Sequence, residues 1–173
     1  MTPTAGLLSI STRREARVFL DSKTFKAVVA STPLVSIDLL VQDSEGRLLL
    51  GHRTNRPAQG YWFAPGGRIL KNESLDQAFN RISETELGKS FERANASLLG
   101  IYEHFYRDSS FGGEGDAPDT HYVVLGYLIK VQEASCLAPT PEQHDSYRWW
   151  TASQIEGSTE VHENTRAFLA ALN

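Results

Sequence analysis

The sequence predicts a mixed α/β fold in a single domain. The clearest signal is an amphipathic helix over residues 74–88, where Ser74-Leu75-Asp76-Gln77 fits a capping box and Gly88 gives a stop signal. Runs rich in β-branched and aromatic residues lie on both sides of this helix and read as strands. A chain of 173 residues can bury about 70% of its unfolded surface in one core, so no metal or disulfide is needed for folding.

The first third of the chain is predicted to form a short helix and a β-hairpin. Residues 21–30 carry an aspartate cap and apolar residues at helical spacing, and a proline soon follows. The apolar runs 34–41 and 47–50 flank four turn-forming residues, which is the pattern of a hairpin. A loop over residues 54–60 comes next.

The remaining elements are predicted in chain order. An aromatic strand over residues 61–64 is stopped by Pro65-Gly66-Gly67, where glycine admits close backbone approach. After the helix come strands over 98–106 and 121–131, separated by a loop of about fourteen residues that is long enough to suggest a function. A strand around 147–150 and a closing helix over 163–172 complete the fold.

Composition excludes several classes of protein. With 17 basic and 21 acidic residues, the net charge of −4 argues against nucleic-acid and membrane-surface partners, which require a basic face. Cys136 is the single cysteine, so no internal disulfide forms, and no apolar stretch reaches membrane-spanning length. We expect a soluble, cytoplasmic protein with a flexible tail over 1–17, a transit peptide being the alternative, and one domain over 18–173.

Glu86 is the first candidate for chemistry. It continues the apolar stripe of Leu75, Phe79 and Ile82, and a carboxylate on an inner helix face is costly unless it is paired or binds a metal. It either reaches water or an arginine at the frayed helix end, or it binds a hard cation such as Mg²⁺.

Basic residues near Gly66-Gly67 suggest a phosphate site. The glycine pair can present bare backbone to a ligand, and Arg53, Arg56 and Arg68 can supply donors for phosphate oxygens. Surface turns and solvated arginines are the alternative interpretation.

Two sets of motifs carry a resemblance to a known family. The chain matches the spacing of a Nudix box, G-x5-E-x7-R-E-U-x-E-E-x-G-U, at Gly67, Glu73, Arg81 and the run Glu86-Leu87-Gly88. Ile82 and Thr85 stand at two glutamate positions of this pattern. Ser83 and Lys89 stand at its two apolar positions, marked U. The remaining matches are the segments Arg53 to Phe63, Pro65 to Arg68, His121 to Gly126 and Glu142 to Asp145. Together they resemble the GDP-mannose mannosyl hydrolase branch of the Nudix family, over roughly Phe19 to Phe168.

The resemblance implies a Nudix-type α/β/α sandwich with a mixed β-sheet, usually a homodimer. It implies hydrolysis of GDP-mannose to GDP and the free sugar by attack of water at the anomeric carbon with inversion, aided by one Mg²⁺ per subunit, with Mn²⁺ as a substitute. GDP-glucose is an open alternative substrate, because the two sugars are epimers at one hydroxyl.

The resemblance also assigns residues to roles. Mg²⁺ is expected on the Gly66 carbonyl, Glu86 and Gln143, all hard oxygen ligands. His144 matches the general base, and Arg53, Arg68 and Tyr122 match groups that stabilise the charge on departing GDP. Asp38 and His104 match polar residues near the sugar and the leaving group. The segment that contacts guanosine is matched by Phe19, Leu20 and Phe25, together with Arg53.

Two other functions stay open. A Nudix pyrophosphohydrolase would cut the diphosphate and give GMP and mannose 1-phosphate, although it needs the missing glutamates. A nucleotide-sugar sensor would bind without hydrolysis. The tail before Phe19 and the loop 107–120 depart from the family pattern and leave sugar access and product release open.

Overall fold

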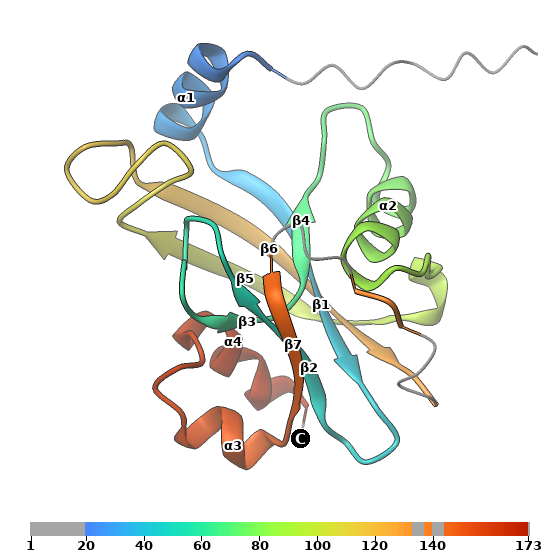
Figure 1. The fold of residues 1–173 in the computed structure, drawn as a ribbon. Coiled ribbons are helices and arrows are strands. Elements are labelled where there is room, and N and C mark those ends of the chain that lie inside the picture. The colour runs from blue at the N-terminus through green and yellow to red at the C-terminus, as the bar shows by residue number, and fades with distance from the viewer. Residues whose placement is uncertain (1–19, 133–136, 140–143, 173) are drawn as a thin grey trace, which may run out of the picture.

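The computed structural model describes residues 20–132, 137–139 and 144–172. Its elements, in chain order, are α1 (Ser22–Ser31), β1 (Leu34–Gln42), β2 (Leu48–Arg53), β3 (Trp62–Phe63), β4 (Gly66–Arg68), α2 (Leu75–Leu87), the 3-10 turn η1 (Arg93–Asn95), β5 (Ser97–Tyr106), β6 (Thr120–Lys130), β7 (His144–Trp150), α3 (Ala152–Gly157), α4 (Glu163–Ala167) and the 3-10 turn η3 (Phe168–Ala171). Figure 1 shows their arrangement.

The strands form one mixed sheet. Its order is β3-β2-β1-β6-β5, while β4 also pairs with β1 and β7 also pairs with β2. Strands β1 and β6 run parallel over nine residue pairs, from Leu34↔Tyr122 to Gln42↔Lys130, and the other pairs are antiparallel. The central β1 therefore joins both halves of the chain.

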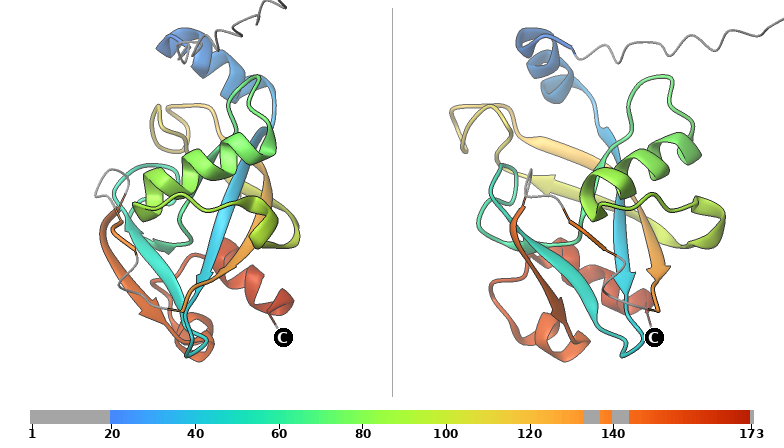
Figure 2. Two further views of the ribbon diagram at one scale, coloured as in Figure 1. Left: turned by 90° about the vertical axis from the view of Figure 1, so that its right-hand side faces the viewer. Right: turned by 45° about the vertical axis from the view of Figure 1, so that its right-hand side comes forward.

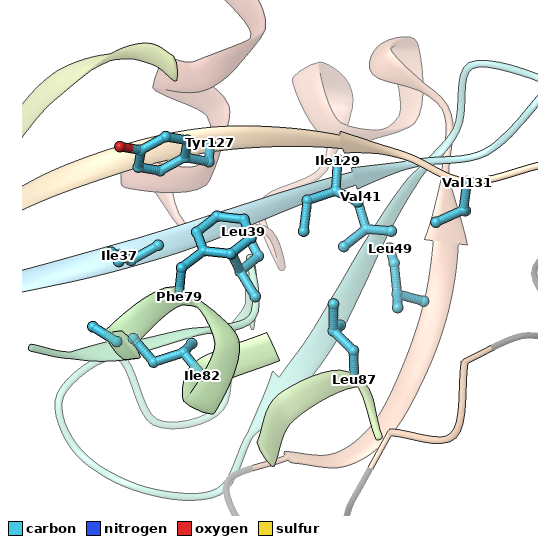
Figure 3. Packing of buried hydrophobic residues seen from close by; sticks show 11 residues of the cluster. Ile37, Leu39, Val41, Leu49, Phe79, Ile82, Leu87, Tyr127, Ile129 and Val131 are labelled. Carbon is cyan, nitrogen blue, oxygen red and sulfur yellow. The ribbon is translucent and has the colours of Figure 1, made fainter. Parts of the chain in front are cut away.

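Helices cover both faces of the sheet, as the views in Figure 2 show. On one face, α2 packs against alternate residues of β1 and β6, and Figure 3 shows Phe79, Ile82 and Leu87 of this helix directed toward the strands. On the other face, Ile155 of α3 and Phe168 of η3 pack in a second core with Leu40, Trp150 and their neighbours. This arrangement confirms the predicted α/β/α sandwich with a mixed sheet.

The sequence signals of α2 are all used in the structure. Ser74 and Gln77 form the capping box, and Gly88 ends the helix with a φ of 68°. Leu75, which lies on the predicted apolar stripe, is an exception because the first turn extends past the core and leaves its side chain 40% exposed. No helix among the described residues is long and apolar enough to cross a membrane.

Four details differ from the sequence predictions. The hairpin of β1 and β2 pairs only at Gln42↔Leu48, because β4 takes the partners at residues 36–38 of β1, while β6 lies along its other edge. Gly66 and Gly67 lie within β4 instead of merely ending a strand. Strand β7 begins at His144, and the C-terminal segment forms α3, α4 and η3 in place of one closing helix.

Candidate active site

A cavity of about 300 Å³ opens on the sheet face opposite α2. Side chains reach it from α1, from the six strands β1 to β6 and from the two loops 54–61 and 107–119. Seven of the predicted site residues line it: Phe25, Asp38, Arg53, Gly66, Arg68, His104 and Tyr122. Residues that lie far apart in the sequence are thus brought together, and the volume falls at the lower end of the range for small-molecule sites.

Asp38 and His104 face each other at the floor of this cavity. Both are buried, and His104 Nδ1 lies 4.0 Å from Asp38 Oδ2. Burial raises the pKa of Asp38 to about 7, and in that balance the charge of Arg53 lowers the pKa while that of Glu86 raises it. Burial lowers the pKa of His104 to about 4, and His162 adds to this effect. Near neutral pH the His104 imidazole is therefore uncharged, and Asp38 is divided between its protonated and ionised forms.

Polar atoms of this pair remain available to a ligand. Asp38 Oδ2 and His104 Nε2 have no hydrogen-bond partner among the described residues, and neither does Arg53 Nε. Buried polar groups are normally hydrogen-bonded, so orphaned atoms beside a cavity indicate a site that a polar ligand completes.

Two of the three predicted phosphate-binding arginines, Arg53 and Arg68, lie against aromatic rings. The Arg68 guanidinium lies 4.1 Å from the ring centroid of Phe25, and that of Arg53 lies 5.6 Å from the centroid of Phe63. Cation–π contacts hold such side chains in place while their N–H groups remain available to anions. Burial raises the pKa of Tyr122, so its hydroxyl stays protonated and can donate a hydrogen bond.

His144 lies in a separate buried cluster and does not line the cavity. Its Nδ1 is 3.1 Å from the Tyr147 hydroxyl and 3.4 Å from Glu86 Oε2, while Nε2 has no hydrogen-bond partner within the described ranges. Gly51 on the neighbouring β2 makes room for the ring, because a Cβ there would lie 2.5 Å from His144 Cγ. An Nδ1–H that donates to these oxygens leaves the Nε2 lone pair as the acceptor.

Two of the expected metal ligands are described by the structure. Glu86 is a buried carboxylate on the inner face of α2, and Gly66 is the register partner of Asp38 in the β1–β4 pair. Since Glu86 raises the pKa of Asp38, the two carboxylates sense each other's charge. No group of three or more His, Cys, Asp or Glu ligands occurs in the described part of the chain, and Gln143 lies outside it. The oxygen donors present fit a hard cation that also takes backbone and ligand oxygens.

Other Nudix-box positions have structural roles. Arg81 binds Glu73 through two hydrogen bonds of 2.6 and 2.7 Å and donates a third, of 2.8 Å, to the Arg68 carbonyl. Ile82, at a glutamate position of the box pattern, is 1% exposed and packs in the α2 core. Only Glu86 keeps a buried carboxylate at one of the final glutamate positions.

The expected guanosine segment is described in part. Phe25 lines the cavity, Leu20 is 51% exposed, and Phe19 lies outside the described residues. Sequence reasoning missed Tyr106, which lines the cavity, and the ion pair of Arg56 with Asp108 at its mouth. The alternation of β5 could have indicated Tyr106, because it shares a strand face with His104.

Comparisons with known proteins agree with this architecture. A family model described as "NUDIX domain" matches residues 32–172. The chain is 40% identical over 109 residues to the low-salt glycan biosynthesis protein Agl8 of Haloferax volcanii, and the match spans 63% of this chain and 66% of Agl8, just under two thirds of that protein.

Solved structures share the fold. A MutT NUDIX hydrolase from Burkholderia pseudomallei is 27% identical with a TM-score of 0.63, over 83% of this chain and all of that one. The MutT protein of Methanosarcina mazei is 20% identical with a TM-score of 0.63, over 82% and 94% of the two chains. The NUDIX domain of Shewanella oneidensis NrtR, solved with ADP ribose, is 18% identical with a TM-score of 0.60, over 87% and 92%.

Proposed function

The chain belongs to the Nudix family of hydrolases, and from that premise we propose that it hydrolyses GDP-mannose, or GDP-glucose, to GDP and the free sugar. Attack occurs at the anomeric carbon with inversion. The observation that carries this proposal is the cavity in which Arg53 and Arg68 accompany the buried Asp38–His104 pair, while the box helix on the other face of the sheet keeps one buried carboxylate, Glu86.

The reduced box favours cleavage at carbon over cleavage at phosphorus. Nudix hydrolases generally use divalent metals such as Mg²⁺, and attack on a phosphorus atom needs the metal to aim the water. Ile82 and Thr85 supply no carboxylate for that task. The Gly66 carbonyl, Glu86 and Gln143 would hold one Mg²⁺, which neutralises charge on the diphosphate when bound.

The reaction itself rests on side chains of this chain. In the proposed step, the oxygen of water forms a bond to the anomeric carbon while His144 Nε2 takes the proton of that water. The sugar must therefore reach from the cavity toward the separate buried cluster that holds His144. The bond from the anomeric carbon to the β-phosphate oxygen breaks, and its electron pair leaves with GDP. Arg53, Arg68 and the Tyr122 hydroxyl stabilise the charge on the departing diphosphate, where donors are most effective as the bond breaks.

Asp38 and His104 orient the sugar and the leaving group. Their unpaired Oδ2 and Nε2 atoms lie at the cavity floor, where each can make one further hydrogen bond to a hydroxyl. A sugar hydroxyl can both donate and accept a hydrogen bond, so it can bond to a carboxyl oxygen and to an imidazole nitrogen alike.

The relatives are consistent with a nucleotide-linked substrate. Agl8 is described by its role in glycan biosynthesis, and the NrtR domain was solved with ADP ribose. Glycan assembly consumes activated sugars, so an enzyme that acts on a nucleotide sugar belongs to the same chemistry. We also propose that the chain forms a homodimer.

The test is proton NMR of the purified chain with GDP-mannose and Mg²⁺. Early appearance of free β-mannose beside GDP, with ¹⁸O from labelled water on the sugar, is the expected result. GMP with mannose 1-phosphate, and label on phosphate, would contradict the proposal and indicate a pyrophosphohydrolase. Tight binding without turnover of either GDP-sugar would indicate a sensor.

His144→Gln tests the base in the same assay. We expect kcat to fall by about 100- to 10,000-fold, as is typical when a general base is removed, with little change in GDP affinity. His121→Gln is the matched control, because His121 stacks on Phe105 and does not line the cavity. Equal rates for the two variants would remove His144 from the mechanism.

A further inference from the structure

The mouth of the cavity is built by two loops that an ion pair joins. Arg56, on the loop between β2 and β3, lines the cavity, and its Nη1 lies 3.1 Å from Asp108 Oδ2. Asp108 begins the loop between β5 and β6, and its backbone carbonyl accepts a 2.7 Å hydrogen bond from the Thr120 hydroxyl. The Asp108 backbone is therefore held beside Thr120, which lines the cavity together with Ser109 and Ser110, the residues that follow Asp108.

The pair keeps hydrogen-bonding capacity that no part of the described chain uses. Asp108 Oδ1 accepts no hydrogen bond from the described residues. Arg56 donates one hydrogen bond, to Asp108 Oδ2, so the other N–H groups of its guanidinium remain available to a ligand. The Arg56 side chain is 45% exposed and that of Asp108 is 20% exposed. The mouth thus offers donors and an acceptor side by side.

An aromatic wall of Phe25 and Phe111 contributes to the same cavity through Phe25. Phe25 of α1 lines the same cavity, and its ring centroid lies 5.5 Å from that of Phe111 on the β5–β6 loop. The Arg68 guanidinium packs on Phe25 as well. Figures 1 and 2 show α1 beside the β5–β6 loop, in agreement with the ring contact of Phe25 with Phe111.

A third phosphate-binding arginine is a poor explanation of Arg56. Its positive charge is already matched by the Asp108 carboxylate, which would repel a phosphate that approached. A ligand edge that carries acceptors and donors next to each other fits better, and a flat ring would rest against the aromatic wall.

We infer that Arg56 and Asp108 recognise the guanine base of the substrate, an inference that rests on the proposed GDP-sugar hydrolysis. Guanine presents O6 and N7 as acceptors, which match the arginine fork. Its N1–H and 2-amino groups are donors, which match a carboxylate. Adenine carries an amino group in place of O6 and no donor at position 2, so it would set donor against donor at Arg56.

The experiment measures dissociation constants of GDP, IDP and ADP by calorimetry in Mg²⁺. IDP lacks only the 2-amino group, so the wild-type chain should bind GDP about tenfold more tightly than IDP, and ADP should bind more weakly still. In Asp108→Asn the GDP-to-IDP ratio should fall toward one. This ratio is insensitive to a general loss of folding, because both ligands meet the same population of protein.

Two arginine variants complete the test. Arg56→Met should weaken GDP about tenfold and leave ADP nearly unchanged. Arg107→Met is the matched control, since Arg107 is 85% exposed and pairs with Glu114 away from the cavity lining. Equal losses for GDP and ADP in Arg56→Met would make it a phosphate contact and overturn the inference, as would equal binding of GDP and IDP by the wild-type chain.

Binding and turnover separate this inference from the proposed function. A guanine preference without release of free sugar would retain the role of Arg56 and Asp108 and reject the sugar chemistry. Release of free sugar with no preference for GDP over IDP and ADP would support the proposed hydrolysis and reject the role of Arg56 and Asp108 in base recognition.

Discussion

The burial of His104 makes the free energy of unfolding depend on pH. A variant of His104 separates this contribution from those of neighbouring groups. Burial lowers the pKa of His104 from 6.5 to about 4, so the unfolded chain binds a proton more readily than the folded one. Its contribution is complete above pH 6.5 and is lost as the pH falls toward 4. Asp38 acts in the opposite sense, because its pKa is raised to about 7; Tyr106 and His162 also lie close by.

The prediction is therefore a difference between variants. Between pH 7.5 and pH 4, the free energy of unfolding should fall by up to about 3 kcal/mol more in the wild-type chain than in His104→Gln. Denaturant unfolding without metal measures both, and His121→Gln should follow the wild type. Parallel profiles for the wild type and His104→Gln would show that His104 is not held neutral by burial.

Individual residues were predictable from the sequence where they belong to a motif. The segments around Arg53 and Arg68 indicated a phosphate site, and both side chains line the cavity. The seclusion of His144 could not be predicted, since it depends on Gly51 of a strand that pairs across a long stretch of sequence. Likewise, nothing local in the sequence joins Arg56 to Asp108.

At the scale of elements, the Glu73–Arg81 pair fixes α2 to the segment that leads into it. Both side chains are less than one fifth exposed, and Arg81 also holds the carbonyl of Arg68 at the end of β4. Removing either partner takes the opposite charge away from a partly buried ionic group, so Arg81→Met and Glu73→Gln should each lower the free energy of unfolding by about 2 kcal/mol.

A double-mutant cycle tests this coupling by urea unfolding. The double variant should be more stable than the sum of the single losses implies, by about 1 kcal/mol or more. The exposed pair of Arg107 with Glu114 is the control and should show no measurable coupling. Strictly additive losses would mean that the pair does not hold α2.

Elements with strong local signals were predicted best. The capping box and terminal glycine placed α2 correctly, because helix ends are set by nearby residues. The short pairing of β1 with β2 was not predictable, since it depends on the pairing of β4 with residues 36–38 of β1. The division of the C-terminal segment into α3, α4 and η3 follows from packing against the second core.

At the scale of the whole molecule, Phe168 connects the C-terminal layer to the cavity floor. Its ring lies 4.5 Å from that of Tyr102 and 5.9 Å from that of His104, and it is fully buried. Phe168→Ala should lower the free energy of unfolding by about 3–5 kcal/mol through the cavity it leaves. Thermal and denaturant unfolding measure this, with Phe105→Ala on the exposed side of β5 as the mild control.

A more conservative variant at the same position tests whether Phe168 also supports the site. Phe168→Leu keeps most of the volume and should retain the fold while weakening binding of the sugar more than binding of GDP. If GDP and the GDP-sugar are weakened equally, Phe168 supports the layer without positioning His104.

The parallel pair of β1 and β6 has a consequence for how the chain folds. It joins residues from opposite halves of the sequence, and Asp38 and Tyr122 lie on its two strands. Chain closure over so long a segment is entropically costly and slow, so contacts of this kind form after the local helix and its neighbours. During folding, α2 can therefore be in place while the cavity that β1 and β6 line does not yet exist, and recovery of ligand binding should lag behind recovery of the helical signal.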